Sequence, residues 1–160
     1  MPVIDTTKAA TSFTIVSDFD APIEQVWQLW ADPRKLERWW GPPGFPSTFR
    51  RHDFTVPGIS LYSMPADGGM PGTMAWRFVA IDEPTALEVD NGFADESGEP
   101  LDGIPWNRVI VRLEALGSQT RQSVTVEFGS PEVLAMMLGY GMVEGMTAAI
   151  GQVEAILAEP

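Results

Sequence analysis

The feature that most constrains this fold is a long series of short alternating segments, followed by only one long helical segment. In "TMAWRF" (residues 73–78), "RVIVRL" (108–113) and "SVTVEF" (123–128), apolar and polar residues alternate. This alternation predicts strands with one buried and one solvated face, which is typical of an antiparallel meander. Further strands are expected at Phe49–Val56, Ile59–Met64 and Ala86–Asn91, with "PADGGMPG" (65–72) as a hairpin loop.

Before these segments the sequence predicts one more strand and two short helices. "TSFTIVSDF" (11–19) alternates as a first strand, and "DAPIEQVWQLWADP" (20–33) carries apolar residues at helical spacing. Pro33 starts the second short helix, "PRKLERWW", for which Asp32 is the expected cap.

The final segment is predicted to be one long helix. "GSPEVL" (129–134) places Ser130 at the N-cap and Pro131 at the first helical position, which is a strong start signal. The four glycines that follow each weaken a helix by roughly 1 kcal/mol relative to alanine. Leu138, Met142 and Met146 nevertheless share one apolar face. We expect this helix to pack that face against the sheet.

This order of elements leaves the inner face of the sheet only partly covered. A meander of six or seven strands curls strongly, whereas one helix is only about 10 Å across. Either large side chains fill the remainder or a cavity stays open, and six tryptophans and eight methionines suit both outcomes. We expect a cavity for an apolar or aromatic ligand, with Arg108 or Tyr140 as a polar anchor if either turns inward. The side chains expected to line it are Trp39, Trp40, Met74, Trp76, Phe78, Trp106, Leu138, Met142 and Met146.

Charge and composition narrow the classes of partner. A formal net charge of −12 argues against nucleic acid, because phosphate contacts need clustered Lys and Arg. Between Arg77 and Arg108 every charged residue is acidic. This run is either a surface for a basic partner or a set of solvated loops.

The same composition predicts a single cytoplasmic domain. No secretory signal is visible, and no apolar run reaches the roughly 18 to 20 residues that a membrane-spanning helix needs, so membrane insertion is not expected. We expect one domain over residues 1–160, with its core from about residue 12 to 157 and a flexible segment at residues 1–11. A homodimer is left open.

Catalytic machinery is sparse in the sequence. With one histidine and no cysteine, neither a metal site nor a cofactor is expected. His52 is a candidate general base at the cavity mouth; alternatively it is a structural or surface histidine. Glu144 is a candidate acid if it is buried; alternatively it faces solvent. The sequence therefore leaves catalysis open and favours a binding protein over an enzyme.

Several motifs, in order, resemble one known family. "FDAPIEQVWQLWADPRKLERWWGP" (19–42), "PADGG" (65–69), "GSPE" (129–132) and "GYGMVEGM" (139–146) are similar to the SRPBCC (START/Bet v 1-like) superfamily. They resemble in particular the branch named after the C-terminal domain of the Hsp90 ATPase activator. The resemblance implies an α+β helix-grip fold, in which a curved antiparallel sheet wraps around a long C-terminal helix with a hydrophobic cavity between them. Met146 stands where many relatives have tryptophan, and "HDFTVPGI" (52–59) departs from the corresponding strand of relatives.

Three functions follow as hypotheses. The first is binding of a hydrophobic small molecule in the cavity. The second is a cyclase-like or hydrolase-like enzyme that uses polar residues at the cavity mouth. The third, implied only by the branch name, is an Hsp90-related co-chaperone that recognises a protein partner.

Overall fold

An eight-stranded antiparallel sheet forms the frame of the molecule. The computed structural model describes residues 2–41, 43–44, 46–64, 72–101, 103 and 105–159. The strands lie in the order β1-β2-β8-β7-β6-β5-β4-β3, and every neighbouring pair is antiparallel. They are β1 (Val3–Lys8), β2 (Ser12–Phe19), β3 (Thr48–His52), β4 (Ile59–Met64), β5 (Gly72–Asp82), β6 (Ala86–Phe93), β7 (Asn107–Leu116) and β8 (Gln119–Glu127).

Five helical segments accompany the sheet. Between β2 and β3 lie α1 (Ile23–Ala31) and α2 (Pro33–Trp39), and after β8 come α3 (Pro131–Gly139), α4 (Met142–Ile150) and α5 (Val153–Leu157). The predicted caps are present at two of these starts. The Asp32 side chain accepts a hydrogen bond from the Arg34 backbone N–H, and Ser130 accepts one from Val133. Both bonds satisfy donors that a helix start otherwise leaves unpaired.

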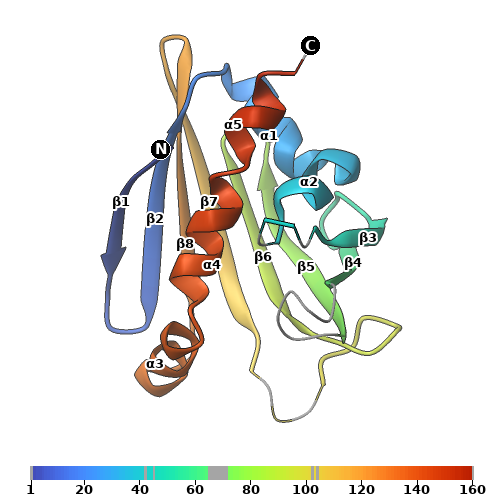
Figure 1. The fold of residues 1–160 in the computed structure, drawn as a ribbon. Helices are drawn as coiled ribbons and strands as arrows, with labels where there is room; N and C mark the ends of the chain where they lie inside the picture. The colour runs from blue at the N-terminus through green and yellow to red at the C-terminus, as the bar shows by residue number, and fades with distance from the viewer. Residues whose placement is uncertain are drawn as a thin grey trace.

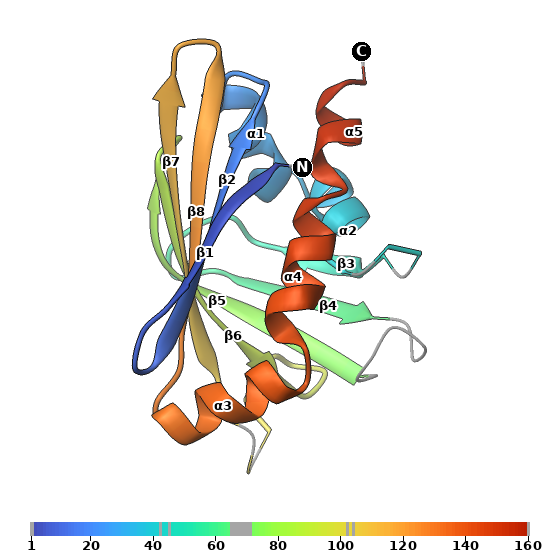
Figure 2. The ribbon, with the colours of Figure 1, turned by 60° about the vertical axis from the view of Figure 1, so that its left-hand side comes forward.

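The helices cover one face of a strongly curled sheet. Helices α4 and α5 run across its concave side, α1 and α2 pack at one end, and α3 lies across the opposite end (Figures 1 and 2). Alternate residues of the strands point into this concavity, so β2 buries Phe13, Ile15 and Phe19. The predicted fold class, an α+β helix-grip arrangement, is confirmed.

The sheet differs from the prediction at both of its edges. Residues 3–8, which were expected to be flexible, form β1 and pair with β2. This strand is almost fully exposed and is held by backbone pairing, so it has no buried face for a hydrophobic pattern to reveal. At the other edge the predicted strand Phe49–Val56 ends at His52, because the backbone turns there through Asp53–Gly58. The predicted hairpin loop at 65–72 lies, except for Gly72, outside the described residues.

The C-terminal helix is bent, which the prediction of one long helix did not include. Its two parts, Pro131–Gly139 and Met142–Leu157, meet at 64°. Gly141 lies at the break with φ = 83°, a left-handed conformation that only glycine adopts without strain. Within the described residues no single helix has the length and apolar character to cross a membrane; this bent pair meets the criteria only when its halves are combined.

The bend predicts opposite effects of the same substitution at two nearby glycines. Gly141→Ala should lower the free energy of unfolding by about 1 to 2 kcal/mol, because alanine is strained in the left-handed region. Gly145→Ala should raise it by about 0.5 to 1 kcal/mol, because Gly145 is inside α4 and an added Cβ would meet no atom within 4 Å. Urea unfolding of both variants measures the difference. Equal effects would show that the left-handed turn does not hold the bend.

Candidate ligand-binding cavity

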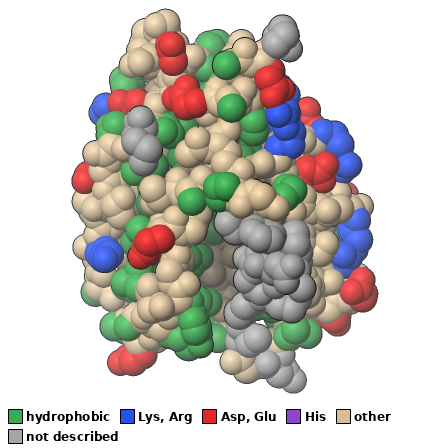
Figure 3. Space-filling view, viewed as in Figure 1, with side chains coloured by type: hydrophobic (Ala, Val, Ile, Leu, Met, Phe, Trp, Pro, Cys, Tyr) green, Lys and Arg blue, Asp and Glu red, His purple; other side chains and the backbone are tan. Residues whose placement is uncertain are grey.

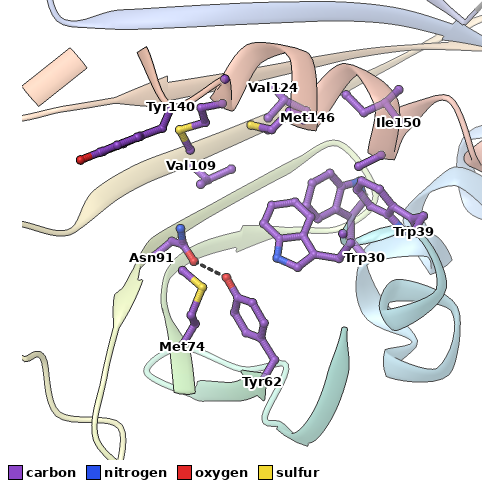
Figure 4. Close-up of a pocket in the computed structure, with 16 residues that line it drawn as sticks. Trp30, Trp39, Tyr62, Met74, Asn91, Val109, Val124, Tyr140, Met146 and Ile150 are labelled. Carbon is purple, nitrogen blue, oxygen red and sulfur yellow. Dashed lines mark hydrogen bonds between the residues drawn. The ribbon is translucent and has the colours of Figure 1, made fainter. Parts of the chain in front are cut away.

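A cavity of about 320 Å³ lies between α4 and the concave face of the sheet. Tryptophans from α1 and α2 close one end, β4 to β8 form the floor, and α4 forms the roof (Figure 4). The face that carries α4 is hollowed beside this helix (Figure 3). None of the described side chains that line the cavity is charged. They are Trp30, Trp39, Trp40, Gly41, Tyr62, Met74, Asn91, Val109, Val124, Tyr140, Gly141, Met142, Gly145, Met146, Ala149 and Ile150.

The tryptophan wall is a rigid part of the cavity. Trp30 packs edge-to-face against Trp39 and Trp40, with ring centroids 4.8 and 5.7 Å apart. Its Nε1 donates to Gln122 Oε1 at 2.9 Å, and Trp39 Nε1 donates to the Leu29 carbonyl at 3.0 Å. Such pairs are favourable beyond their buried area, and the hydrogen bonds fix the ring planes. The wall is therefore formed before any ligand arrives.

The helical roof is softer and has gaps. Met142 and Met146 point into the cavity from α4, where they alternate with Gly141 and Gly145. Methionine side chains have several rotatable bonds and adapt to irregular shapes. Gly145 leaves open space, since no atom lies within 4 Å of the position that a Cβ would take. The glycines of this segment thus serve the bend at Gly141 and the volume of the cavity at Gly145.

A buried polar cluster crosses the floor of the cavity. The Tyr62 hydroxyl donates to Asn91 Oδ1 at 2.6 Å, and Asn91 Nδ2 donates to Asn107 Oδ1 at 3.4 Å. Tyr62 and Asn91 are only 1% and 5% exposed. Burial raises the pKa of Tyr62 well above its ordinary value, and the indoles of Trp40 and Trp76 oppose this only in part. The hydroxyl is therefore a neutral hydrogen-bond donor.

Tyr62 and Asn91 were not among the residues predicted from the sequence, although one signal in β6 indicates such a site. In β6 the inward positions read Leu87, Val89, Asn91, so an amide continues an apolar alternation at a buried position. Asn107 lies opposite it at the start of β7. Buried amides are rare unless they are paired, so such a break in an apolar face indicates a polar cluster.

The predicted lining residues fall into two groups. Trp39, Trp40, Met142 and Met146 line the cavity, as do Met74 and Tyr140. Tyr140 is 74% exposed, which places it at the rim. Trp76, Phe78 and Leu138 do not line the cavity, in contrast to the prediction.

The three residues that miss the cavity belong to the surrounding core. Trp76 is fully buried behind Trp40, with ring centroids 5.0 Å apart, and so supports the wall. Phe78 lies two residues further along β5 and packs on Trp76 and Phe54. Leu138 belongs to α3, and the 64° bend separates its face from that of α4.

Trp106 was wrongly predicted to line the cavity. It packs on the opposite face of the sheet, over Gly92, where an added Cβ would come within 2.1 Å of its ring. Its Nε1 donates to the Phe93 carbonyl at 2.9 Å, and the Arg77 guanidinium lies 5.4 Å from the ring centroid. The reason is register: Asn107 faces inward, so the residue before it faces outward.

Arg108 also lies on the outer face and cannot be the inward anchor. Its Nε and an Nη donate to the two carboxylate oxygens of Asp90 at 2.8 and 3.2 Å. Asp90 is its direct neighbour on β6. This ion pair raises the pKa of Arg108 above its ordinary value.

His52 has a structural role instead of the predicted position at the cavity mouth. Nε2 lies 3.0 Å from the Trp30 carbonyl, and Nδ1 lies 2.7 Å from Ser60 Oγ. A carbonyl can only accept, so Nε2 carries the proton and Nδ1 accepts from the Ser60 hydroxyl. Burial lowers the pKa of His52, and the hydrogen bond to Trp30 opposes this in part. With both nitrogens engaged and no position on the cavity, His52 is not placed to act as a general base there.

Glu144 faces solvent, which is the second of the two alternatives that the sequence leaves open for it. It lies in the first turn of α4, is exposed, and borders a shallow groove with Thr147 and Ala148 on the outer side of the helix. The condition for a catalytic acid, burial, is not met. In the described part of the chain, no group of three His, Asp or Glu side chains could hold a metal ion.

The sequence matches a family model over most of its length. Residues 20–158 match the family described as activator of Hsp90 ATPase homolog 1-like protein. The chain belongs to this family. The resemblance inferred from the motifs is therefore confirmed.

Solved structures agree with membership of the activator of Hsp90 ATPase homolog 1-like family. The chain is 45% identical to a protein from Arthrobacter aurescens, covering 99% of this chain and 93% of that one, with a TM-score of 0.90. It is 34% identical to a protein from Mycobacterium smegmatis, covering 98% of both chains, with a TM-score of 0.86. A Staphylococcus epidermidis protein at 21% identity, covering 96% of this chain and 93% of that one, shares the fold with a TM-score of 0.84. No curated protein matches the sequence.

The buried His52 predicts a specific pH dependence of stability in this family member. Its pKa is lowered on folding, so below about pH 6.5 the unfolded chain takes up a proton at His52 before the folded protein does. The free energy of unfolding therefore decreases as the pH is lowered below about 6.5. His52→Gln removes this contribution. The thermal midpoint of the unmodified protein minus that of the variant should shrink from about pH 7.5 to about pH 5.5.

Taking this difference cancels the carboxylate titrations that both proteins share. A difference that stays constant or grows toward acid pH would contradict a neutral, buried His52.

Proposed function

We propose that the protein binds an uncharged hydrophobic small molecule in the cavity between α4 and the sheet. The observation that carries this proposal is the open volume of about 320 Å³ with tryptophan and methionine walls and no charge on any lining residue that the structure describes. Ligand sites in proteins are typically concave, mostly apolar and about 300 to 1,000 Å³ in volume. The cavity is at the small end of this range, which suits a molecule of one to three rings.

The expected affinity follows from the area that such a ligand buries. A ring system that loses roughly 200 Å² of apolar surface gains about 5 kcal/mol at about 25 cal/mol per Å². Because the tryptophan wall is already fixed by packing and hydrogen bonds, little of this gain is lost to ordering side chains. Simple aromatic probes should therefore bind with dissociation constants of about 0.2 to 1 mM.

Binding is favoured over catalysis by the chemistry of the lining. General acid-base catalysis needs a titratable group close to the reacting atoms. The two candidates, His52 and Glu144, lie outside the cavity, and the Tyr62 hydroxyl stays neutral because burial raises its pKa. A cyclase-like or hydrolase-like reaction would depend on the rim, where Tyr140 is exposed.

The family description supplies a second candidate, activation of the Hsp90 ATPase through a protein contact. In this chain, the acidic segment that could attract a basic partner is partly paired within the molecule. Asp90, Glu96 and Glu99 form ion pairs with Arg108, Arg50 and Arg77. If this segment nevertheless governs association, binding to Hsp90 should weaken as salt is raised.

Filling the cavity should weaken ligand binding. Met146→Trp places an indole in the open space beside Gly145 and should weaken binding of the neutral fluorophore N-phenyl-1-naphthylamine by about tenfold or more. Met136→Trp is the matched control, because Met136 is exposed on α3 and does not line the cavity. Its affinity should stay within about twofold of the unmodified protein. Titrations followed by fluorophore emission measure both.

Equal binding by the two variants would refute the cavity as the binding site. Native mass spectrometry of freshly purified protein provides a second readout. A co-purified small molecule should be present in the unmodified protein and in Met136→Trp, and absent from Met146→Trp.

A further inference from the structure

The lining of the cavity is apolar except for a few side chains, and two of these are buried together in the floor. Tyr62 and Asn91 reach the cavity from β4 and β6, on the same concave face. Asn91 turns its amide oxygen toward Tyr62 and its amide nitrogen away from it, in the direction of α4 (Figure 4). These two residues therefore determine which polar atoms a ligand can place at the floor.

The Asn91 side chain has one hydrogen-bond donor without a protein partner among the described residues. Its oxygen accepts from the Tyr62 hydroxyl at 2.6 Å. Its nitrogen carries two N–H groups and makes one long hydrogen bond, to Asn107 Oδ1 at 3.4 Å. No second acceptor for this nitrogen is found among the described residues. A buried donor without an acceptor costs free energy, which a ligand acceptor would recover.

We infer that Asn91 is a specificity-determining residue, and that the ligand is an uncharged ring compound carrying a hydrogen-bond acceptor such as a carbonyl oxygen. This inference rests on the proposed function. The acceptor would lie against Asn91 Nδ2, and the rings would pack between the tryptophan wall and the methionines of α4. A carboxylate is disfavoured because, within the described part of the chain, no lining side chain carries a positive charge to pair with it.

Tyr62 acts as a positioning residue in this arrangement. An asparagine amide can rotate by 180° and exchange its oxygen and nitrogen. The Tyr62 hydroxyl donates to the oxygen at 2.6 Å and Asn107 Oδ1 accepts from the nitrogen at 3.4 Å, so the shorter Tyr62 bond is the main one that holds the oxygen toward β4 and leaves the second N–H for the ligand. Phenylalanine at position 62 would keep the stacking on Phe49, whose ring centroid lies 4.7 Å away. It would remove only the hydroxyl that donates to the Asn91 oxygen.

The inference is tested with three probes of similar size: 1-tetralone, tetralin and 1-naphthoate. The first two share a carbon skeleton and differ by one carbonyl oxygen. The ratio of their dissociation constants, measured by isothermal titration calorimetry, reports the hydrogen bond and cancels changes in cavity shape. The unmodified protein should prefer 1-tetralone over tetralin by about fivefold or more. It should bind 1-naphthoate more weakly than tetralin by about tenfold or more.

Three variants test whether Asn91 causes the preference for 1-tetralone over tetralin. Asn91→Leu should reduce the ratio to about one while tetralin still binds. Tyr62→Phe should reduce it to below about threefold, since the amide is no longer held in one orientation. Because the only other tyrosine, Tyr140, itself lines the cavity, the matched control is Gln25→Leu, which makes the same amide-to-leucine change at an exposed residue of α1 outside the cavity. This control should leave the ratio unchanged.

The outcomes separate the inference from the proposed function. If tetralin and 1-tetralone bind equally well to the unmodified protein, the cavity binds ligands but Asn91 does not select them. Preferential binding of 1-naphthoate, or a ratio that survives in Asn91→Leu, would also overturn the inference. If none of the probes binds, the proposed function fails and the inference fails with it.

Discussion

The mismatch between the area of the sheet and the width of its covering helix governs the structure. Eight strands at a spacing of about 4.8 Å span roughly 34 Å, whereas a helix with its side chains is about 10 Å wide. Burial of the remaining concave surface has to come from elsewhere. Helices α1 and α2 supply it at one end, where Trp27, Trp30 and Trp39 are almost fully buried. Beyond their reach the concave face remains open, and the cavity lies there.

The two sides of the cavity differ in how firmly they are held. On one side the indoles pack against each other and are fixed by hydrogen bonds to Gln122 and the Leu29 carbonyl. Trp30 also accepts a hydrogen bond from His52 through its carbonyl, so the sole histidine supports the wall from behind. On the other side the methionines of α4 are held by no polar contact. A stiff aromatic wall opposite a deformable roof suits ligands that share a flat face and differ in outline.

The sequence predicted the parts of this architecture that repeat along the chain. Alternation in β5, β7 and β8 and helical spacing in α1 and α4 identified the elements, and Met142 and Met146, which were expected on the inner face of the last helix, line the cavity. Predictions failed where one residue or one bond decides the outcome. Trp106 precedes its strand by one position and so faces outward, and β1 is held by backbone pairing that leaves no hydrophobic pattern.

The polar cluster in the cavity floor could not be predicted from any single segment of the sequence. Tyr62, Asn91 and Asn107 come from three strands and become a cluster only through the pairing of β4 to β7. Likewise, the role of His52 depends on a carbonyl 22 positions earlier in the chain. Composition identifies such residues as candidates, but their partners are set by strand register, which spacing along the chain does not specify.

The bend at Gly141 also allows a C-terminal helical segment that is longer than the strands to pack against the sheet. A straight helix over residues 131–157 would measure roughly 40 Å, while strands of 8 to 11 residues measure roughly 26 to 36 Å. The excess is folded back across the end of the sheet as α3. One short segment thus closes that end through a single glycine joint. Rotation about this joint could enlarge or shrink the enclosed space while every strand pairing stays in place.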